Sequence, residues 1–430
     1  DCWMESGSMP YGERHYPFEN KNDLENSFPA DFIVEYTGQV RAWFYVMHVI
    51  ANALKNSHCF KNVVVTGVMA GTDGRKMSKS YSNYPDPKEI LTKFGGDALR
   101  LYLLTSPVMS GKNVNMTKGD EIEEQVKKVL LILWNTYRYF LTYVNYHNLD
   151  LKQIKNIDIA KNSKKNILDS YIISKLHLFI KDFSDSLEKY RIPNAVKLIQ
   201  PFVDELSTWY LRNSRNRFVV GDITAFQIMY YILINFSKAA APAVPFITES
   251  IYQNLKPENS KESIHLDDYP DFNNKFIDLK LHTKMEIVQD LVNRGHSLRK
   301  QKQIKLRQPL AKLKIKSANW RKKLKIELED KNELLDLIKD ELNVKVVEFL
   351  AGKELEVEFD TRITPALQAE GEAREFIRKV QDLRKKNGCS LNELITVYAP
   401  LWPEAFEKEI KKKALIKKLI KADQLKISKS

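Results

Sequence analysis

A chain of 430 residues, 43% of them hydrophobic, is long enough to bury the cores of two or three domains. Its net charge of +13 suits a polyanionic partner, although many basic proteins without such a partner carry a similar charge. Only three cysteines occur, far apart, which excludes a disulfide framework and a Cys-x-x-Cys zinc site. This cysteine usage fits a reducing, cytoplasmic setting. No apolar run reaches the length of a membrane span, so we expect no membrane segments.

Residues 1–30 are rich in glycine, proline, asparagine and aromatic residues, which predicts an ordered loop rather than a helix. Trp3 lies in this stretch beside acidic residues and the flexible Gly7. Its ring is suited to wall a pocket, although a lone tryptophan is more often part of a core.

Residues 29–54 are apolar enough to predict one nearly buried helix. Glu35, Gln39 and Trp43 are spaced four residues apart and would form one stripe on that helix. A carboxylate and an amide need polar partners, so this stripe suits the wall of a pocket for a small zwitterion. The alternative is a polar stripe that faces solvent.

The run Val63–Val65 predicts a buried strand, and the glycines after it allow a tight loop, beginning at Gly67. The loop leads to Lys76-Met77-Ser78-Lys79-Ser80. Two lysines with hydroxyl neighbours can meet the β- and γ-phosphates of a nucleotide as a leaving pyrophosphate gains charge. A solvated basic loop is the alternative.

Four segments together resemble class I aminoacyl-tRNA synthetases, and isoleucyl-tRNA synthetases in particular. They are DCWMESGSMP at 1–10, EYTGQVRAWFYVMHVI at 35–50, KMSKS at 76–80 and KFGGDALRLYLLTSPVMSG at 93–111. KMSKS is shared with valyl and leucyl enzymes, whereas the Gln39-x-x-x-Trp43-Phe44 pattern favours isoleucine. One departure is Thr66, where many relatives have a histidine.

The resemblance implies a role for each matching residue. Glu35 would contact the isoleucyl-adenylate, and Gln39, Trp43 and Trp3 would shape the amino-acid pocket. Catalysis and ATP binding would fall to Lys79, assisted by Lys76 and Ser78, with Gly67 in the nucleotide loop. Magnesium would arrive with ATP, and we expect no protein-bound metal or zinc.

After the loop, Asp86-Pro87 predicts a helix start, and that helix is expected to end at Gly95-Gly96. Asp97 is expected to cap the next helix and to pair with Arg100.

From Asp120 the periodicity predicts a bundle of four long helices, at about 121–144, 167–190, 194–217 and 225–255. The third carries Trp209, Arg212, Arg215 and Arg217, a combination that can hold RNA by phosphate contact and base stacking. A solvated arginine face fits the same spacing. Residues 204–218 and 241–255 resemble the anticodon-binding bundle of the same synthetases.

From about Phe276 helix and strand alternate. We expect helices at 283–303 and 365–387 and strands at 311–316, 344–350 and 354–360. A cationic helix is expected at the end of the chain, either for contact with tRNA phosphates or as a solubilising face.

The fold class expected from these segments is α/β plus mainly α. Residues 1–119 would form the second half of a Rossmann-type catalytic domain, 120–275 a helical anticodon-binding domain, and 276–430 a small α+β domain that contacts tRNA. No His-x-Gly-His motif occurs in the sequence. We therefore expect the carboxy-terminal portion of a synthetase, inactive in adenylate formation by itself.

The function implied is an isoleucine-tRNA ligase that binds ATP, isoleucine and tRNA(Ile), as a monomer. Two alternatives remain open: a valyl enzyme with a smaller pocket, and a non-catalytic tRNA-binding protein in which KMSKS is a relic.

Overall fold

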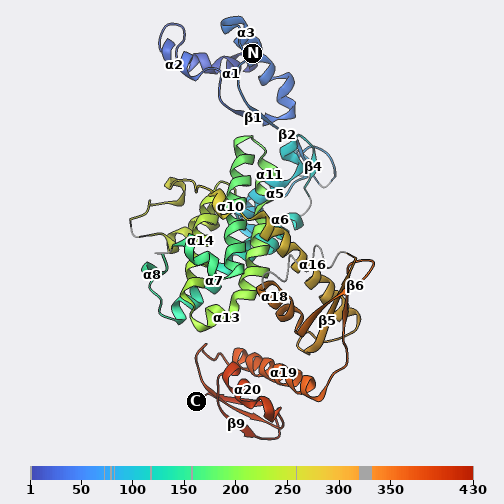
Figure 1. Cartoon of the computed structure of the whole chain (residues 1–430). Helices are drawn as coiled ribbons and strands as arrows, with labels where there is room; N and C mark the ends of the chain where they lie inside the picture. Colours follow the sequence, from blue (N-terminus) through green and yellow to red (C-terminus); the bar gives the residue numbers. More distant parts are fainter. Residues whose placement is uncertain are drawn as a thin grey trace. The chain divides into compact units, whose positions relative to one another are not determined.

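The computed structural model describes residues 2–71, 73–77, 80–81, 83–116, 119–155, 158–257, 259–318 and 332–429. The chain divides into two compact units, Asp1–Ile277 and Asp278–Ser430 (Figure 1). The division that the sequence predicts at 119/120 falls inside the first unit.

The first thirty residues include two helices where a loop was expected. They form α1 (Cys2–Gly12) and α2 (Lys21–Ser27). Helix α1 packs closely against α3 (Trp43–Lys55). Gly7 makes this close approach possible, since a Cβ there would lie 2.8 Å from Val46 Cγ1. Tertiary packing of this kind overrides the weak local helix propensity of the segment.

The single helix expected at 29–54 is also wrong. The chain forms strand β1 (Ile33–Tyr36), a 3-10 turn (Thr37–Arg41) and then α3. Strand β1 pairs in parallel with β2 (Val63–Thr66), so its β-branched residues are used in a sheet. Glu35, Gln39 and Trp43 therefore lie on a strand, a turn and a helix start instead of one helical stripe.

A second short parallel pair supports the loop region. Strand β3 (Met69–Ala70) pairs with β4 (Val114–Asn115), and Met116 N–H donates to the carbonyl of Ala70 at 2.8 Å. Between them lie α4 (Pro87–Phe94), α5 (Gly96–Thr105) and a 3-10 turn at Pro107–Ser110. The predicted helix start is confirmed, and the Asp86 side chain caps it by accepting from Lys88 N–H.

Asp97 does not cap α5 as expected. It is buried inside that helix, and its carboxylate accepts from the backbone N–H groups of Phe246 and Ile247 at 3.2 and 2.7 Å. These residues begin α15 (Pro245–Leu255), so Asp97 caps a helix far along the chain. Arg100 donates to the carbonyls of Pro242 and Ala243. This pair thus ties α5 to the bundle.

The predicted bundle is confirmed. Its long helices are α7 (Leu131–Tyr146), α10 (Ile167–Glu188), α13 (Arg212–Val220), α14 (Ile223–Ala240) and α15. Helix α6 (Asp120–Gln125) joins α7 through a π-helical segment, and α11 (Ile192–Val196) and α12 (Ile199–Asp204) lead through another, Glu205–Leu211, into α13. The helix expected at 225–255 is broken between α14 and α15, where Pro242 and Pro245 lie.

Shorter helical elements connect the bundle. They are α8 (Leu151–Lys155), α9 (Ile159–Asn162) and 3-10 turns at Ser163–Lys165, Ile264–Leu266 and Asn274–Phe276. Across the described residues no helix is long and apolar enough to cross a membrane.

The second unit consists of two halves with the same topology. The first runs α16 (Leu279–Gln301), β5 (Leu310–Ser317), α18 (Asn332–Leu342), β6 (Val344–Ala351) and β7 (Glu356–Phe359). The second runs α19 (Pro365–Lys386), β8 (Ile395–Ala399), a 3-10 turn (Glu404–Phe406), α20 (Glu407–Ala414), β9 (Ile416–Lys421) and β10 (Lys426–Lys429). In each sheet the first strand is central, parallel to the second and antiparallel to the third.

The two halves share internal detail as well as topology. Arg299 and Arg384 are buried in the last turns of α16 and α19, and each guanidinium donates to two carbonyls of the loop that follows. These carbonyls belong to Lys305 and Gln308 in the first half and to Ser390 and Glu393 in the second. The expected strands 311–316, 344–350 and 354–360 are confirmed, but the cationic tail is a helix followed by two strands.

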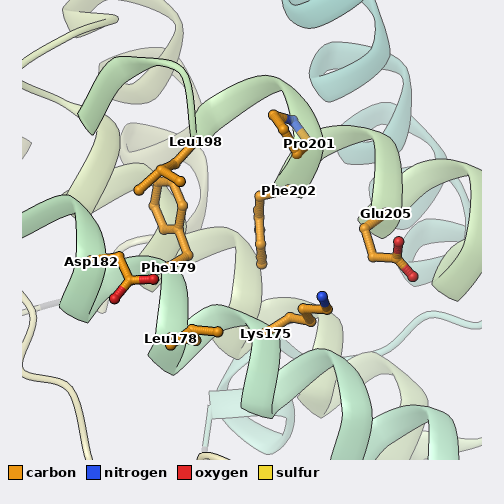
Figure 2. Close-up of a pocket in the computed structure, with 8 residues that line it drawn as sticks. All are labelled: Lys175, Leu178, Phe179, Asp182, Leu198, Pro201, Phe202 and Glu205. Atoms are coloured by element: carbon orange, nitrogen blue, oxygen red, sulfur yellow. The ribbon is translucent and has the colours of Figure 1, made fainter. Parts of the chain in front are cut away.

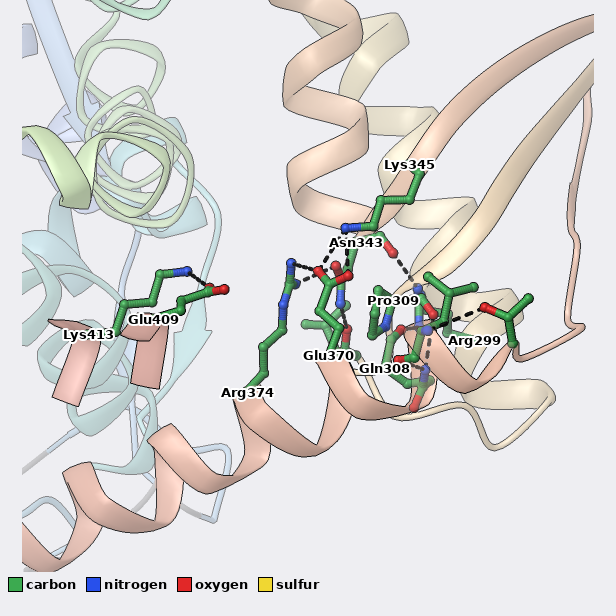
Figure 3. A network of polar contacts seen from close by, with 12 residues as sticks. Arg299, Gln308, Pro309, Asn343, Lys345, Glu370, Arg374, Glu409 and Lys413 are labelled. Carbon is green, nitrogen blue, oxygen red and sulfur yellow. Dashed lines mark hydrogen bonds and ion pairs between the residues drawn. The ribbon is translucent and has the colours of Figure 1, made fainter. Parts of the chain in front are cut away.

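Helix α19 is fastened to the first half by polar contacts (Figure 3). Gln308 Nε2 donates to the carbonyl of Leu367 at 2.9 Å. Arg374 bridges the side chains of Asn343 and Glu370. The segment around Gln308 thus has a structural role between the two halves.

Candidate active site

The loop that carries Lys76 is anchored on β3. Ala70 and Lys76 form an antiparallel bridge, and Gly71 N–H donates to the carbonyl of Arg75 at 2.8 Å. A Cβ on Gly71 would lie 2.1 Å from the carbonyl oxygen of Asn83. The two backbone segments are therefore so close at this point that only glycine fits. The backbone geometry presents Lys76 at the edge of a parallel strand pair.

Asp73 neutralises Arg75 in this loop. Hydrogen bonds from the Asn83 side chain and from Arg75 lower the pKa of Asp73 to about 2. Its Oδ2 lies 2.8 Å from Arg75 Nε. Among the described residues Lys76 has no carboxylate partner, so its ammonium group remains available to an anionic ligand.

Lys76 instead lies over an aromatic ring. Its Nζ is 4.9 Å from the centroid of Tyr36, the last residue of β1. Gly38 permits this ring position, because a Cβ there would lie 2.4 Å from Tyr36 Cε2. Parallel sheets bind ligands beyond the carboxyl ends of their strands, and both Glu35 and Lys76 are found at this edge.

The residues expected to form the amino-acid pocket are brought together in part. Glu35 Oε2 accepts from Tyr36 N–H at 3.0 Å, and Gln39 Oε1 accepts from Trp43 N–H at 3.3 Å. Gln39 therefore satisfies the first backbone N–H of α3. Trp43 Nε1 donates to the carbonyl of Ser6 on α1 at 3.2 Å. Trp3 lies one turn earlier on α1 and is 40% exposed, which fits a pocket wall better than a core position.

Three further residues were expected to bind ATP: Gly67, Ser78 and Lys79. Ser78 and Lys79 lie outside the described residues. Gly67 has a structural reason to be glycine, because a Cβ there would lie 2.0 Å from the carbonyl oxygen of Lys112. Its N–H donates to the carbonyl of Val108 at 2.7 Å, so the described structure gives it no free donor for ATP.

The proposed RNA-binding set of the bundle divides into two pairs. Trp209 is 6% exposed and therefore cannot stack on a base. Arg217 binds the buried Asp169 through Nη1 and Nη2 at 2.7 and 2.8 Å, and its Nε binds Asp222. Burial lowers the pKa of Arg217, but the hydrogen bonds and charge of Asp169 outweigh that effect and raise it. Trp209 is therefore part of the core and Arg217 is half-buried and occupied by Asp169, which argues against the RNA contacts expected of them. Arg212 and Arg215 are exposed on α13.

A separate cavity of about 190 Å³ lies between α10 and the α12 region (Figure 2). Phe179 and Phe202 line it with their ring centroids 5.2 Å apart, and burial raises the pKa of Asp182 at its edge. Its walls are bundle residues remote in sequence from the loop of Lys76, and we assign it no part in the site.

The sequence argument missed the contacts that Tyr36, Asp73 and Asn83 make around the loop of Lys76. Tyr36 directly follows Glu35 and precedes Thr37-Gly38. Had the sequence analysis predicted a strand here, it would have placed Tyr36 at the carboxyl end of that strand. Across the described residues, no group of three or more metal-ligating side chains is present.

Comparisons with known proteins find two matching families. The family described as tRNA synthetases class I (I, L, M and V) matches residues 1–116, and the anticodon-binding domain of tRNA ligase matches residues 169–315. The second match extends beyond the predicted boundary at 275. The first match contains Glu35, Tyr36 and Lys76, and the second contains Arg212 and Arg215.

Two bacterial relatives are isoleucine–tRNA ligases. That of Protochlamydia amoebophila is 40% identical over 359 residues, 82% of this chain and 33% of the relative. That of Treponema denticola is 40% identical over 377 residues, 84% of this chain and 34% of the relative. The chain thus spans about a third of the length of the curated relatives it matches.

A solved structure shows the same fold at low identity. It is the Agrobacterium radiobacter LeuRS, crystallised in a ternary complex with tRNA and LeuAMS. It aligns with 65% of this chain and 33% of its own, at a TM-score of 0.50 and 17% identity. The two family models and the two isoleucine–tRNA ligase relatives show that the chain belongs to the class I aminoacyl-tRNA synthetases and is a homologue of the isoleucine–tRNA ligases.

Proposed function

We propose that this chain contributes the KMSKS half-site and the anticodon-binding region of an isoleucine–tRNA ligase. The observation that carries the proposal is 40% identity to isoleucine–tRNA ligases over 82% of the chain, in a sequence that has Lys76 beside the carboxyl end of β1. We place the enzyme in the cytoplasm and expect it to act as a monomer.

The reaction has two steps. The isoleucine carboxylate oxygen bonds to the α-phosphorus of ATP, the bond to the β-phosphate oxygen breaks, and pyrophosphate leaves. A terminal ribose hydroxyl of tRNA(Ile) then attacks the activated carbonyl, AMP leaves and the hydroxyl proton is released. The protein mainly positions the reactants and stabilises developing charge.

The charge of Lys76 suits the first step. Its exposed ammonium meets the β- and γ-phosphates. The resemblance assigns the same task to Lys79 and Ser78, which lie outside the described residues. Magnesium is carried by ATP and supplies further positive charge there. Glu35 stands at the same strand end and contacts the adenylate, and Trp43 and Trp3 wall the amino-acid side.

The second step requires tRNA. Arg212 and Arg215 are the exposed cations of α13, within the region that matches anticodon-binding domains. Guanidinium groups pair readily with phosphate oxygens, so these two residues contact the tRNA backbone.

A chimaera tests the proposal. The segment of the Protochlamydia ligase that aligns with this chain is replaced by the chain itself, and isoleucine-dependent exchange of pyrophosphate into ATP is measured. Exchange with isoleucine supports the proposal. Exchange that prefers valine would replace it with the valyl enzyme. A folded chimaera that binds tRNA but shows no exchange, beside an active parent enzyme, would favour a binding protein.

A further inference from the structure

The sheet of the second half of the carboxy-terminal unit has one buried and one open face. Ile395, Val397 and Ala399 on β8 are buried in a core with residues of α19. Alternate residues of a strand point to opposite faces, so Thr396 and Tyr398 lie on the open face.

Cross-strand pairing fixes what surrounds these two residues. Directly opposite residues of neighbouring strands point to the same face. The neighbours so placed are Lys418 and Ser428 beside Thr396, and Ile420 and Lys426 beside Tyr398. All four neighbours are exposed. A hollow of about 500 Å³, lined in part by Tyr398 and Lys426, opens here, with Asp423 on its border.

The equivalent face of the first half has a different charge pattern. There Lys312 pairs with Glu348 at 2.5 Å and Lys316 with Glu358 at 2.8 Å. The strand pairing shows which positions of the two sheets correspond. Three glutamates of the first sheet are replaced by other residues in the second: Glu348 by Lys418, Glu356 by Lys426 and Glu358 by Ser428. Among the described residues neither Lys418 nor Lys426 forms an ion pair. The open face of the sheet is therefore close to neutral in the first half and cationic in the second half.

We propose that the open face of the β10-β8-β9 sheet binds a single-stranded segment of RNA. One base stacks on Tyr398, and Lys418 and Lys426 meet the flanking phosphates. An aromatic ring between two unpaired cations and two hydroxyls is complementary to an unstacked base within a phosphate backbone. The inference rests on the proposed function, which supplies tRNA as the RNA.

The test measures binding of the 430-residue chain to a tRNA transcript and to a single-stranded oligouridylate at several salt concentrations. Tyr398→Ala should weaken binding of both roughly tenfold, whereas Tyr398→Phe keeps the ring and should bind like the wild type. Lys418→Ala with Lys426→Ala should lower the slope of log Kd against log salt by about 1.5. The matched control is Lys385→Ala with Lys386→Ala on α19, which covers the other face of the sheet.

Equal affinity of Tyr398→Ala and Tyr398→Phe, or an effect of the sheet lysines no greater than that of the control pair, would overturn the inference. So would loss of phosphatidylserine-vesicle binding instead of RNA binding in the sheet variants. Because Arg212 and Arg215 lie elsewhere, tRNA binding that responds to them alone would leave the proposed function standing without this face. A wild-type chain that binds neither RNA would contradict both.

Discussion

The ammonium group of Lys76 lies 4.9 Å from the ring centroid of Tyr36, which links the KMSKS loop to the carboxyl end of the first strand. A cation over an aromatic face gains about 0.5–1 kcal/mol at an exposed site. That is enough to bias a loop toward one position without fixing it there.

The first prediction concerns this pairing. In the chimaera, Tyr36→Leu removes the aromatic ring and should slow pyrophosphate exchange a few-fold, because Lys76 loses the cation–π contact that favours its position. Tyr36→Phe keeps the ring and serves as the matched control, with a rate close to that of the wild type. If the two variants exchanged pyrophosphate at the same rate, the ring would have no role in placing the lysine.

The lysines themselves should matter more. Lys79→Ala should raise the barrier to adenylate formation by about 2–4 kcal/mol, the scale of losing one donor to transition-state charge. Lys76→Ala should slow the same step. Arg75→Ala is the comparison, since Arg75 is already neutralised by Asp73. An unchanged exchange rate in Lys79→Ala would remove that residue from catalysis.

The third prediction separates two arginines of α13. Arg217→Ala leaves the buried Asp169 without its charge partner and should cost about 3–5 kcal/mol of unfolding free energy. Arg215→Ala, on the exposed face of the same helix, should change it by less than about 0.5 kcal/mol. Urea titration followed by circular dichroism measures both. Similar losses in the two variants would contradict the division into core and surface.

The exposed arginines should affect tRNA instead. Arg212→Ala with Arg215→Ala should weaken tRNA binding and lower its salt slope by about 1.5, while exchange in the chimaera is retained. Lys164→Ala with Lys165→Ala removes the same charge elsewhere on the bundle and is the control. The bundle assignment fails if exchange falls while tRNA affinity holds.

His177 should make the bundle sensitive to acid. Its ring is buried, stacks on Phe276 and accepts from Asn273 N–H through Nδ1. Burial lowers its pKa to about 4, below the value of about 6.5 in an unfolded chain. The unfolded state therefore binds the proton first, and stability falls as pH drops from about 6.5 to about 4, by up to about 3 kcal/mol.

The variant His177→Gln isolates this term. Other groups titrate in the same window, so the quantity to measure is the difference in unfolding free energy between wild type and variant at each pH. The difference should be greatest near neutral pH and shrink on acidification. A constant difference between pH 7 and pH 4 would show that His177 does not titrate on unfolding.

Much of the fold could be predicted from the sequence. The bundle helices and the strands of the carboxy-terminal unit have clear periodicity, and the Asp86-Pro87 cap is a local signal. The segment with Glu35 misled the analysis, because IVEY becomes a strand only through pairing with residues 63–66. Asp97 was likewise placed at the nearest helix, whereas it caps one about 150 residues away in sequence.

The sequence indicated which residue types belong to the candidate site, but not which residues they contact. Periodicity could not distinguish the half-buried Arg217 from the exposed Arg215, since the difference depends on Asp169 in another helix. The internal repeat was also missed. Its two halves share only short matches, such as Leu298-Arg299-Lys300 with Leu383-Arg384-Lys385, and the pattern became visible through strand order.

The most direct test of the central claim is the relative kcat/KM of the chimaera for isoleucine, valine and leucine. We predict that isoleucine is the best substrate and valine the main error, separated by about 1–3 kcal/mol, a range that isoleucine–tRNA ligases themselves helped to define. Trp43→Ala should narrow that gap, whereas Glu35→Ala should depress isoleucine and valine together. A higher kcat/KM for valine than for isoleucine would contradict the account.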